Sequence, residues 1–548
     1  MADMKIHWID LTIIIVYLLG ITLIGVVMSR RQTESSARYF LAGRSLGWVT
    51  VGLALFATNI STVHLIGLAS SGYSDGMVVG NFEWLAPFLL IMLGLVFAPF
   101  YFGSKISTLP EYLEGRYGPA SRTFLAFMAV VGALFIHIGV TLYAGAVMFQ
   151  NFVDMDILWS ILIVSFLTVI YTVAGGLKAV VITESIQTVL LLVGATAVTA
   201  FGLVALHDRG ITSLEALTEA AKPGQMSMIR TEGEYAWWIM LLGYPVLGVW
   251  YWCSDQTIVQ RVLGAKTERD AQIGPIFAGF IKVLPVFLMV LPGVIGYVLF
   301  ADKIGENPDA TLITLIQELL PVGLQGFVVA GLLAALMSTV AGALNSTSTL
   351  VSIDIVKRIR PETSDHALVR IGQITTVVVM ILAIAWSTQG ERFGGIFKGI
   401  NAMIAVLAPP ISTVFVWGIF WRRGTAAASL TTMLVGFILG AIVFAVDFPA
   451  MSGLLLGVDS SGEPIQLVTK QWGIPFMLQA WWLFVICSVL FVITSYLTKP
   501  PDAAQLDRYC WRHPFAVIAE KRIEGPWDPR VLSGTLILLM ATCYWIFA

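Results

Sequence analysis

Residues 52–64 read Gly-Leu-Ala-Leu-Phe-Ala-Thr-Asn-Ile-Ser-Thr-Val-His, and this stretch decides the fold. Its first half is apolar enough to enter a membrane, whereas its second half carries Thr, Asn, Ser, Thr and His side chains. Such groups are costly inside a bilayer unless they face protein or water. The stretch therefore predicts a membrane-spanning helix that is broken where it faces a polar site.

A second predicted span also looks interrupted. Residues 243–252 read Gly-Tyr-Pro-Val-Leu-Gly-Val-Trp-Tyr-Trp, in which the proline removes a backbone donor and the glycines relax the helix. Glycine and proline are ordinary in membrane helices, so neither stretch is decisive alone. The two lie about five predicted spans apart. Two discontinuous helices at matching places in two halves of a chain indicate a transporter with its site at the bilayer midplane.

The composition of the whole chain also suits a membrane. Of its 548 residues, 57% are hydrophobic and 12% are charged, whereas soluble domains have about 25% charged residues. Runs of about 20 apolar residues can cross the hydrocarbon, and they predict an all-α protein with about 14 spans. These runs are 10–28, 46–71, 80–103, 123–150, 156–176, 180–206, 236–256, 272–300, 311–354, 368–388, 396–421, 425–446, 473–497 and 530–547. The run at 311–354 is too long for one span, so we expect a separate piece before a helix at 324–354.

The basic residues set the predicted orientation, because Lys and Arg gather in cytoplasmic loops. With the N-terminus outside, most of the 32 Lys and Arg fall in inner loops such as 29–45, 257–271 and 498–529. Both termini are therefore expected outside, and the short loops favour a bacterial inner membrane. The first apolar run, 11–28, is too long for a signal peptide and has its arginines on the wrong side, so it should stay in the membrane.

Several functional classes are disfavoured. A net charge of −2 argues against nucleic acid as a partner. The four cysteines and six histidines are dispersed without metal-ligand spacing. The sequence contains no P-loop and no nucleophile elbow, so we expect neither an ATP-driven pump nor an enzyme.

Ionisable side chains inside predicted spans mark functional sites by default. Glu83 and Lys282 are two of them, and one interpretation is that they merely neutralise each other. The other is that they bind a polyhydroxylated solute, whose hydroxyls donate and accept and so need carboxylate, amide, imidazole and ammonium groups together. Aromatic faces would cover the C–H surface of such a solute. The side chains available for this site are Asn59, His64, Glu83, Lys282, Tyr251 and Trp252.

Residues 335–349, Ala-Leu-Met-Ser-Thr-Val-Ala-Gly-Ala-Leu-Asn-Ser-Thr-Ser-Thr, are dense in small and hydroxyl side chains. Sodium is a hard cation that needs neutral oxygens, and adjacent hydroxyls with the carbonyls of a broken helix would supply them. Close helix packing, with Ser and Thr bonded back to their own helix, explains the same residues equally well.

At these residues the chain resembles the sodium/solute symporter family, and within it the sodium/glucose cotransporter branch. The matching pieces lie between about residues 38 and 425: Phe-Ala-Thr-Asn-Ile-Ser at 56–61, Asn-Phe-Glu-Trp at 81–84, Trp-Tyr-Trp-Cys-Ser-Asp-Gln-Thr-Ile-Val-Gln-Arg at 250–261, Ala-Leu-Met-Ser-Thr at 335–339, Leu-Asn-Ser-Thr-Ser-Thr at 344–349 and Leu-Ala-Pro-Pro-Ile at 407–411. The resemblance implies a leucine-transporter-like fold of two inverted five-helix repeats with broken first helices. The expected parts are an extra N-terminal helix and loop at 1–45, the first repeat at 46–206, an extracellular loop at 207–235, the second repeat at 236–421 and additional helices at 422–548.

The resemblance also implies two binding sites. Sodium would be held by the carbonyls of Ala57, Ile60 and Ala335 and the hydroxyls of Ser338 and Thr339. The sugar would be held by Asn59, His64, Glu83, Lys282 and Asn401, with Tyr251 as an inner gate beneath it and Trp252 beside it. Glutamine is usual in the family where Asn401 stands, which leaves the identity of the sugar open, and His64 is similar to the animal glucose carriers.

Some family members bind a second sodium between an acidic residue and hydroxyls one turn below the first site. Here the acid would be Glu184, but that turn offers Ala341 and Gly342, which have no hydroxyl. We therefore expect one sodium per sugar.

The function implied by the resemblance is sodium-coupled symport of a glucose- or galactose-like monosaccharide by alternating access, carried out by a monomer surrounded by membrane lipid. The same machine with another cargo, such as inositol, a sialic acid, an amino acid or a vitamin, is the alternative. A solute sensor would need an appended signalling domain, and an intramembrane enzyme would need a nucleophile or metal motif. The sequence displays neither.

Overall fold

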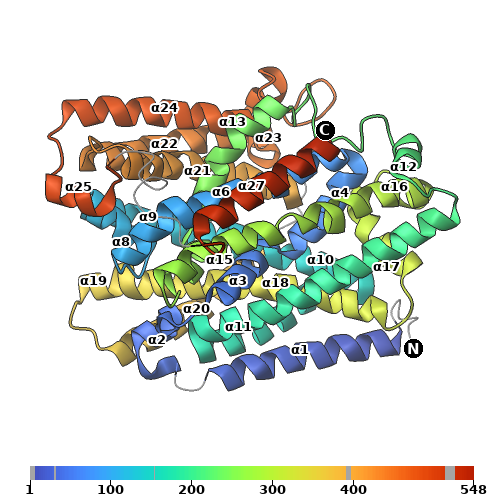
Figure 1. Cartoon of the computed structure of the whole chain (residues 1–548), viewed down its shortest axis with the longest axis horizontal. Helices are drawn as coiled ribbons and strands as arrows, with labels where there is room; N and C mark the ends of the chain where they lie inside the picture. Colours follow the sequence, from blue (N-terminus) through green and yellow to red (C-terminus); the bar gives the residue numbers. More distant parts are fainter. Residues whose placement is uncertain (1–6, 30–31, 154, 390–395, 513–524) are drawn as a thin grey trace.

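The computed structural model describes residues 7–29, 32–153, 155–389, 396–512 and 525–548. Within these ranges the chain is helical, and its only β-structure is three isolated bridges. The helices run side by side along the long axis of the molecule (Figure 1). Of the described helices, 11 are long and apolar enough to cross a membrane, or up to 12 if a bent pair counts as one span. The predicted all-α membrane fold is confirmed.

The described helices fall into three groups. The long ones are α1 (Trp8–Met28), α11 (Ile157–Asp208), α18 (Leu324–Thr349), α20 (Asp365–Ser387), α21 (Ile396–Phe420), α22 (Ala426–Asp447), α24 (Phe476–Leu497) and α27 (Pro529–Ile546). Five spans are built from consecutive pieces, and the first two are α3 (Trp48–Asn59) with α4 (Thr62–Ser74), and the series η3 (Met77–Gly80), α5 (Asn81–Trp84), α6 (Ala86–Met92), η4 (Leu93–Phe97) and α7 (Ala98–Gly103). The third consists of α9 (Pro119–Gly132), η5 (Ala133–Val140) and α10 (Thr141–Val153), and the fourth of α13 (Trp237–Gly248) and η6 (Val249–Ser254). The fifth consists of α15 (Glu268–Ile281), η7 (Val286–Val290) and α16 (Leu291–Ile304). Shorter helices include α2 (Ser36–Leu41), α8 (Leu109–Arg116), α12 (Leu214–Ala220), α14 (Gln256–Leu263), α17 (Thr311–Leu319), η9 (Leu350–Val356), α19 (Lys357–Ile359), α23 (Pro449–Leu456) and α25 (Ala503–Tyr509).

Two places account for the difference from the predicted number of spans. Helix α11 joins two predicted spans into one run of 52 residues, with a sharp break at Gly176 (φ 53°, ψ −151°). A side chain at Gly176 would collide with the backbone of Tyr39, so glycine is required at this break. Helix α13 is only 12 residues long before it changes to π-helix. The division into two inverted repeats stays a prediction.

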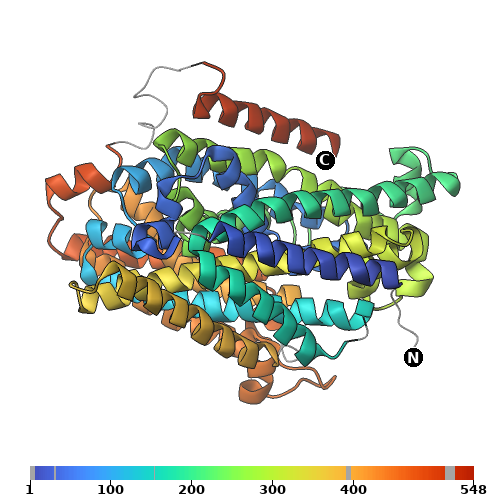
Figure 2. The same cartoon turned by 90° about the horizontal axis from the view of Figure 1, so that it is seen from below.

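The connecting segments separate to the two ends of the bundle. Helices α2, α8, α19 and α25 gather at one end, and α12 and α17 lie at the other (Figure 1). The sequence predicts inner positions for the segments of the first group and an outer position for α12, and which end faces the cytoplasm stays a prediction. Helix α1 begins, and α27 ends, toward the end that carries α12 (Figure 1), and α27 runs along one outer face of the bundle (Figure 2).

The first predicted interruption is present. Between Trp48–Asn59 and His64–Ser74 the helix axis bends by 61°. Ile60 and Ser61 are extended there, with ψ of 101° and 172°. The second interruption lies later than the sequence suggests. Helix α13 passes through Pro245 unbroken, and the chain becomes extended only at Asp255 (φ −84°, ψ 125°), after η6.

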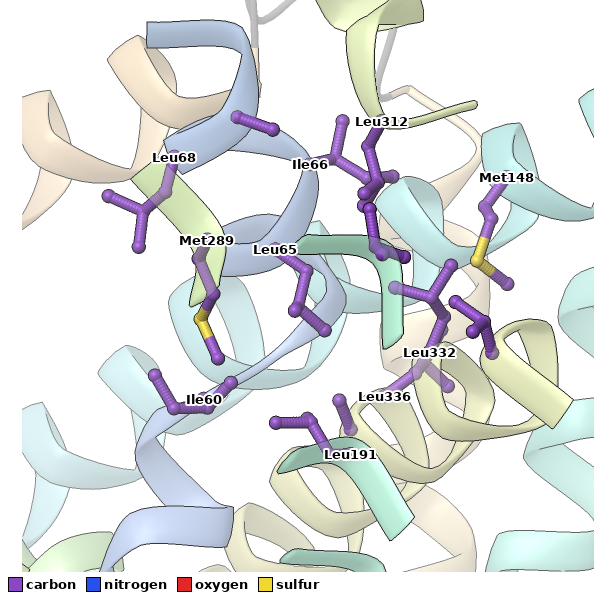
Figure 3. Packing of buried hydrophobic residues seen from close by; sticks show 14 of the residues in the cluster. Ile60, Leu65, Ile66, Leu68, Met148, Leu191, Met289, Leu312, Leu332 and Leu336 are labelled. Atoms are coloured by element: carbon purple, nitrogen blue, oxygen red, sulfur yellow. The ribbon is translucent and has the colours of Figure 1, made fainter. Parts of the chain in front are cut away.

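Helix α18 occupies the centre of the molecule and is buried along nearly its whole length. It packs against α11, α1 and α3. Figure 3 shows how apolar side chains gather around the break, with Ile60 and Leu65 beside Leu191 of α11 and Leu336 of α18. This packing holds the broken helix against α18.

Candidate functional site

A cavity lies beside the break between α3 and α4. Its volume is about 120 Å³, well above the roughly 10–15 Å³ that one water needs, so it can hold several waters or a small solute. Six of the seven residues predicted to bind a sugar line it: Asn59, His64, Glu83, Tyr251, Trp252 and Lys282. The seventh, Asn401, lies outside the residues whose side chains the structure describes. Ile404 on the same helix, α21, lines the cavity.

Glu83 and Lys282 form a salt bridge in the wall of the cavity. Their side chains are 3% and 1% exposed, so the two charges are removed from water together. The Lys282 ammonium also lies 5.5 Å from the ring centre of Trp252 and 6.0 Å from that of Phe56, which are cation–π distances. The structural pairing considered from the sequence is therefore present, and it stands where a bound solute would meet both groups.

Asn59 and Tyr251 join the end of α3 to η6. Asn59 Nδ2 donates to the Tyr251 hydroxyl at 3.2 Å. Asn59 Oδ1 is buried and has no hydrogen-bond partner among the described residues. Buried polar atoms are rarely left unpaired, so we expect this oxygen to accept a hydrogen bond from a solute or from water. The ring of Tyr251 meets that of Trp252 edge-on, with 5.2 Å between ring centres.

His64 begins the second half of the broken helix, and local bonds set its orientation. The Ser61 amide donates to His64 Nδ1 at 3.3 Å, and the Ser61 hydroxyl lies 3.0 Å from the same atom. Because Nδ1 accepts the amide hydrogen, we assign the proton of the neutral imidazole to Nε2. His64 therefore brings a hydrogen-bond donor to the cavity that it lines.

The predicted sodium ligands meet where α18 passes the end of α3. The Ser338 hydroxyl lies 2.8 Å from the carbonyl oxygen of Ala57 and 2.9 Å from that of Ala335. The Thr339 hydroxyl lies 3.1 Å from the carbonyl oxygen of Thr58 and 3.2 Å from that of Ala335. The hydroxyl-rich stretch therefore bonds both to its own helix and to the broken one.

The chemistry of these atoms suits an alkali cation. They are neutral carbonyl and hydroxyl oxygens, and the residues that carry them are buried. Ile60, the remaining predicted ligand, is an extended residue of the break itself and is fully buried. Carbonyls of unwound membrane helices are common sodium ligands in transporters. Among the described residues, no group of three or more His, Cys, Asp or Glu could hold a metal ion.

Glu184 pairs with a residue that the sequence did not bring to the site. It forms a salt bridge with Arg261, and both side chains are 0% exposed. The Thr58 hydroxyl donates to Glu184 Oε1 at 3.0 Å, which places the pair beside the end of α3. The sequence predicts an inner loop at 257–271, but the structure buries Arg261 in α14, because its partner comes from a distant span. A side chain at Gly342 would collide with the guanidinium, so this glycine makes room for Arg261.

A second buried pair was also missed. His137 lines the cavity, and its Nε2 lies 3.0 Å from Asp255 Oδ2. Asp255 Oδ1 accepts the Thr257 amide hydrogen at 2.6 Å and so caps α14. The available signal was a lone histidine within the apolar run 123–150.

Comparison with known proteins gives consistent results. The model of the sodium:solute symporter family matches residues 39–436. The chain is 33% identical to sodium/glucose cotransporter 1 of Oryctolagus cuniculus over 545 residues, covering 92% of this chain and 81% of that protein. It is 31% identical to sodium/myo-inositol cotransporter 2 of the same species, covering 92% and 78%. Among solved structures, a substrate-bound, outward-open Na+-coupled sialic acid symporter superimposes with a TM-score of 0.76 at 20% identity, covering 90% of this chain and 99% of that one.

Proposed function

Because the chain belongs to the sodium:solute symporter family, we propose that it couples sodium entry to the uptake of a glucose- or galactose-like monosaccharide by alternating access. Its coupling ion is sodium, and it is a multi-pass membrane transporter and not an enzyme. We further propose one sodium per sugar, a monomeric working unit, and a bacterial plasma membrane with both termini outside.

The observation that carries the sugar proposal is the mixture of hydrogen-bonding groups around one cavity. Glu83 accepts, Lys282 donates, His64 donates through Nε2, and Asn59 Oδ1 is an acceptor without a partner among the described residues. A sugar presents several hydroxyls that each donate and accept, so such a wall can satisfy many of them at once. An amino acid would bring two charges that need matching, whereas Glu83 and Lys282 already neutralise each other.

Sodium would act on the sugar site through α3. The Ser338 hydroxyl bonds to the carbonyl of Ala57, which lies two residues before Asn59 in the chain. A cation shared by these oxygens would draw α3 onto α18 and fix Asn59 together with its partner Tyr251. Release of the ion to the inside would loosen the same contacts and free the sugar. At a membrane potential of 100 mV, one positive charge contributes about 2.3 kcal/mol in addition to the concentration gradient.

The proposed stoichiometry is supported by the environment of Glu184. Arg261 already neutralises this carboxylate at a site where both side chains are 0% exposed. A second sodium would have to displace the guanidinium, and Ala341 and Gly342 offer no hydroxyl to receive it. Parallel measurement of charge movement and labelled sugar in liposomes should give one charge per sugar. A ratio of two would overturn this part of the proposal.

A cyclic polyol such as myo-inositol is the second candidate cargo. Its ring also presents hydroxyls on every side, so the same donors and acceptors would serve it. The 33% and 31% identities to a glucose and an inositol cotransporter are too similar to separate the two.

The decisive experiment is uptake by the purified chain in liposomes. Glucose, galactose, myo-inositol, a sialic acid and an amino acid would each be offered with an inward sodium gradient and with the gradient replaced by potassium. We expect accumulation of a monosaccharide only with sodium. Uptake that is independent of sodium would refute the coupling. Sodium-dependent uptake of a solute other than a monosaccharide, with no monosaccharide uptake, would refute the sugar assignment.

A further inference from the structure

Helix α27 lies on the outer face of the bundle and packs against α15 (Figure 2). Much of its surface faces away from the protein, with Leu538 70% exposed and Trp545 82% exposed. Its last turn is different. There Tyr544 and Phe547 reach the segment that carries Glu83, although α27 is predicted to lie outside both five-helix repeats.

Tyr544 binds a side chain two residues before Glu83. Its hydroxyl donates to Asn81 Oδ1 at 2.7 Å. Asn81 Nδ2 in turn donates to the carbonyl oxygens of Val78 at 2.9 Å and Met228 at 2.7 Å. Both amide hydrogens and the amide oxygen of Asn81 are thus engaged, and the side chain is only 7% exposed. Tyr544 therefore supplies the hydrogen bond that completes the fixation of Asn81.

The residue after Glu83 is held by the same helix. The ring of Trp84 is fully buried and meets Tyr544 at 5.3 Å and Phe547 at 5.9 Å between ring centres. Trp84 Nε1 donates to the carbonyl oxygen of Val283 at 3.2 Å, and Val283 directly follows Lys282. Contacts of α27 and of Phe547, which follows it, thus reach Asn81 and Trp84 on either side of Glu83 and, through Trp84, the neighbour of Lys282.

This support matters because α5 lies at the start of the span Met77–Gly103. It has only four residues, Asn81–Trp84, and follows a 3-10 turn at Met77–Gly80. The first turns of a helix lack partners for their backbone N–H groups, so contacts from other elements are needed to fix them. A binding carboxylate must nevertheless stay within about 0.5 Å of its productive position.

From these contacts we infer that Tyr544 is a positioning residue for the solute site: its hydrogen bond to Asn81 fixes the one-turn helix α5 and thereby the Glu83 carboxylate against Lys282. This inference rests on the proposed role of Glu83 and Lys282 in binding the sugar. Helix α27, which lies outside the predicted repeats, thereby contributes directly to the affinity for the solute.

The test compares Tyr544→Phe, which removes only the hydroxyl, with Trp545→Phe on the exposed face of α27. Loss of one buried hydrogen bond should raise the sugar KM by about two- to tenfold. At saturating sugar, the half-saturating sodium concentration should stay at the wild-type value, because the Ser338 region is not touched. Trp545→Phe should leave both unchanged. In an Asn81→Ala background the Tyr544→Phe change should have no further effect, since their shared bond is already gone.

A second measurement works without any solute. Hydrogen–deuterium exchange of the 77–85 peptide should be faster in Tyr544→Phe than in wild type or Trp545→Phe. Unchanged exchange would overturn the inference, and so would faster exchange with an unaltered sugar KM. If the wild-type chain takes up no sugar, the proposed function is refuted. The hydrogen–deuterium exchange of the 77–85 peptide then decides by itself whether Tyr544 positions α5.

Discussion

Replacing Lys282 by Met tests whether the buried pair with Glu83 serves structure, binding or both. The change leaves an unbranched side chain that is one atom shorter and removes the ammonium, so the Glu83 carboxylate, 3% exposed, loses its counter-charge. Breaking a buried ion pair from one side costs about 3–5 kcal/mol. The thermal midpoint of the variant should therefore fall by an amount that corresponds to this loss of about 3–5 kcal/mol.

The double variant Glu83→Gln with Lys282→Met separates the two roles. It removes both charges and leaves side chains of similar volume, which often restores most of the lost stability. A sugar, however, would still lack its charged acceptor and donor, and hydrogen bonds to charged groups are worth about 1.5–3 kcal/mol each. We therefore expect near-normal thermal stability combined with a loss of transport of at least about tenfold.

The assay pairs thermal denaturation of the purified variants with sodium-driven sugar uptake in liposomes. Lys303→Met is the matched control, because Lys303 pairs with Glu318 at the surface, where the two side chains are 51% and 39% exposed. Such a pair contributes about 0–1 kcal/mol, so its loss should alter neither measurement. Wild-type uptake by the double variant would refute the reasoning, because the pair would then be structural only.

Two further predictions concern α18. Thr339→Val should raise the half-saturating sodium concentration about five- to tenfold, since it removes one buried oxygen near the break. Thr347→Val should leave sodium dependence unchanged, because that hydroxyl bonds only to its own helix at 2.8 Å. An equal effect of the two in a sodium titration would refute the proposed site. Asp10→Ala should lower the thermal midpoint by an amount that corresponds to about 0.5–2 kcal/mol, because Asp10 Oδ1 accepts the amide hydrogens of Gly323 and Gly326 at 2.7 and 2.6 Å. Sugar KM should be unaltered in that variant, and an unchanged melting curve would show that the cap contributes nothing.

The parts of the site that could be predicted are those whose signal is local. A run of polar residues inside an apolar span marks its own break, and the structure bends there by 61°. The six cavity-lining residues could be predicted for a related reason, since each is a polar or aromatic group in an otherwise apolar or interrupted span. By contrast, Pro245 marked the second interruption too early. Neighbouring helices can satisfy the carbonyl that a proline leaves free, so the helix continues past it.

The parts that escaped prediction depend on partners far apart in sequence. Arg261 looked like a loop residue because nothing near it in the chain shows that Glu184, 77 positions away, would neutralise it inside the membrane. Gly342 was read as a missing hydroxyl, whereas its role is to leave space for that guanidinium. Tyr544 and Asn81 are 463 positions apart. Such pairs are set by helix packing, which no periodicity within one span can reveal.

The contacts around Thr58 bring these observations together. Its carbonyl oxygen is bound by Thr339, and its hydroxyl is bound to Glu184, which Arg261 neutralises. Asn59, the next residue, contacts Tyr251 beside the cavity. The end of α3 is thus held by neutral oxygens of α18 on one side and by a fixed, internally balanced charge pair on the other. A guanidinium cannot leave its helix, so the proposed sodium at the Ser338 region is the only movable cation that this arrangement of described residues provides for. One mobile cation would therefore tighten and release α3, whereas the second positive charge, that of Arg261, stays in place. This is the physical reason to expect coupling to a single ion.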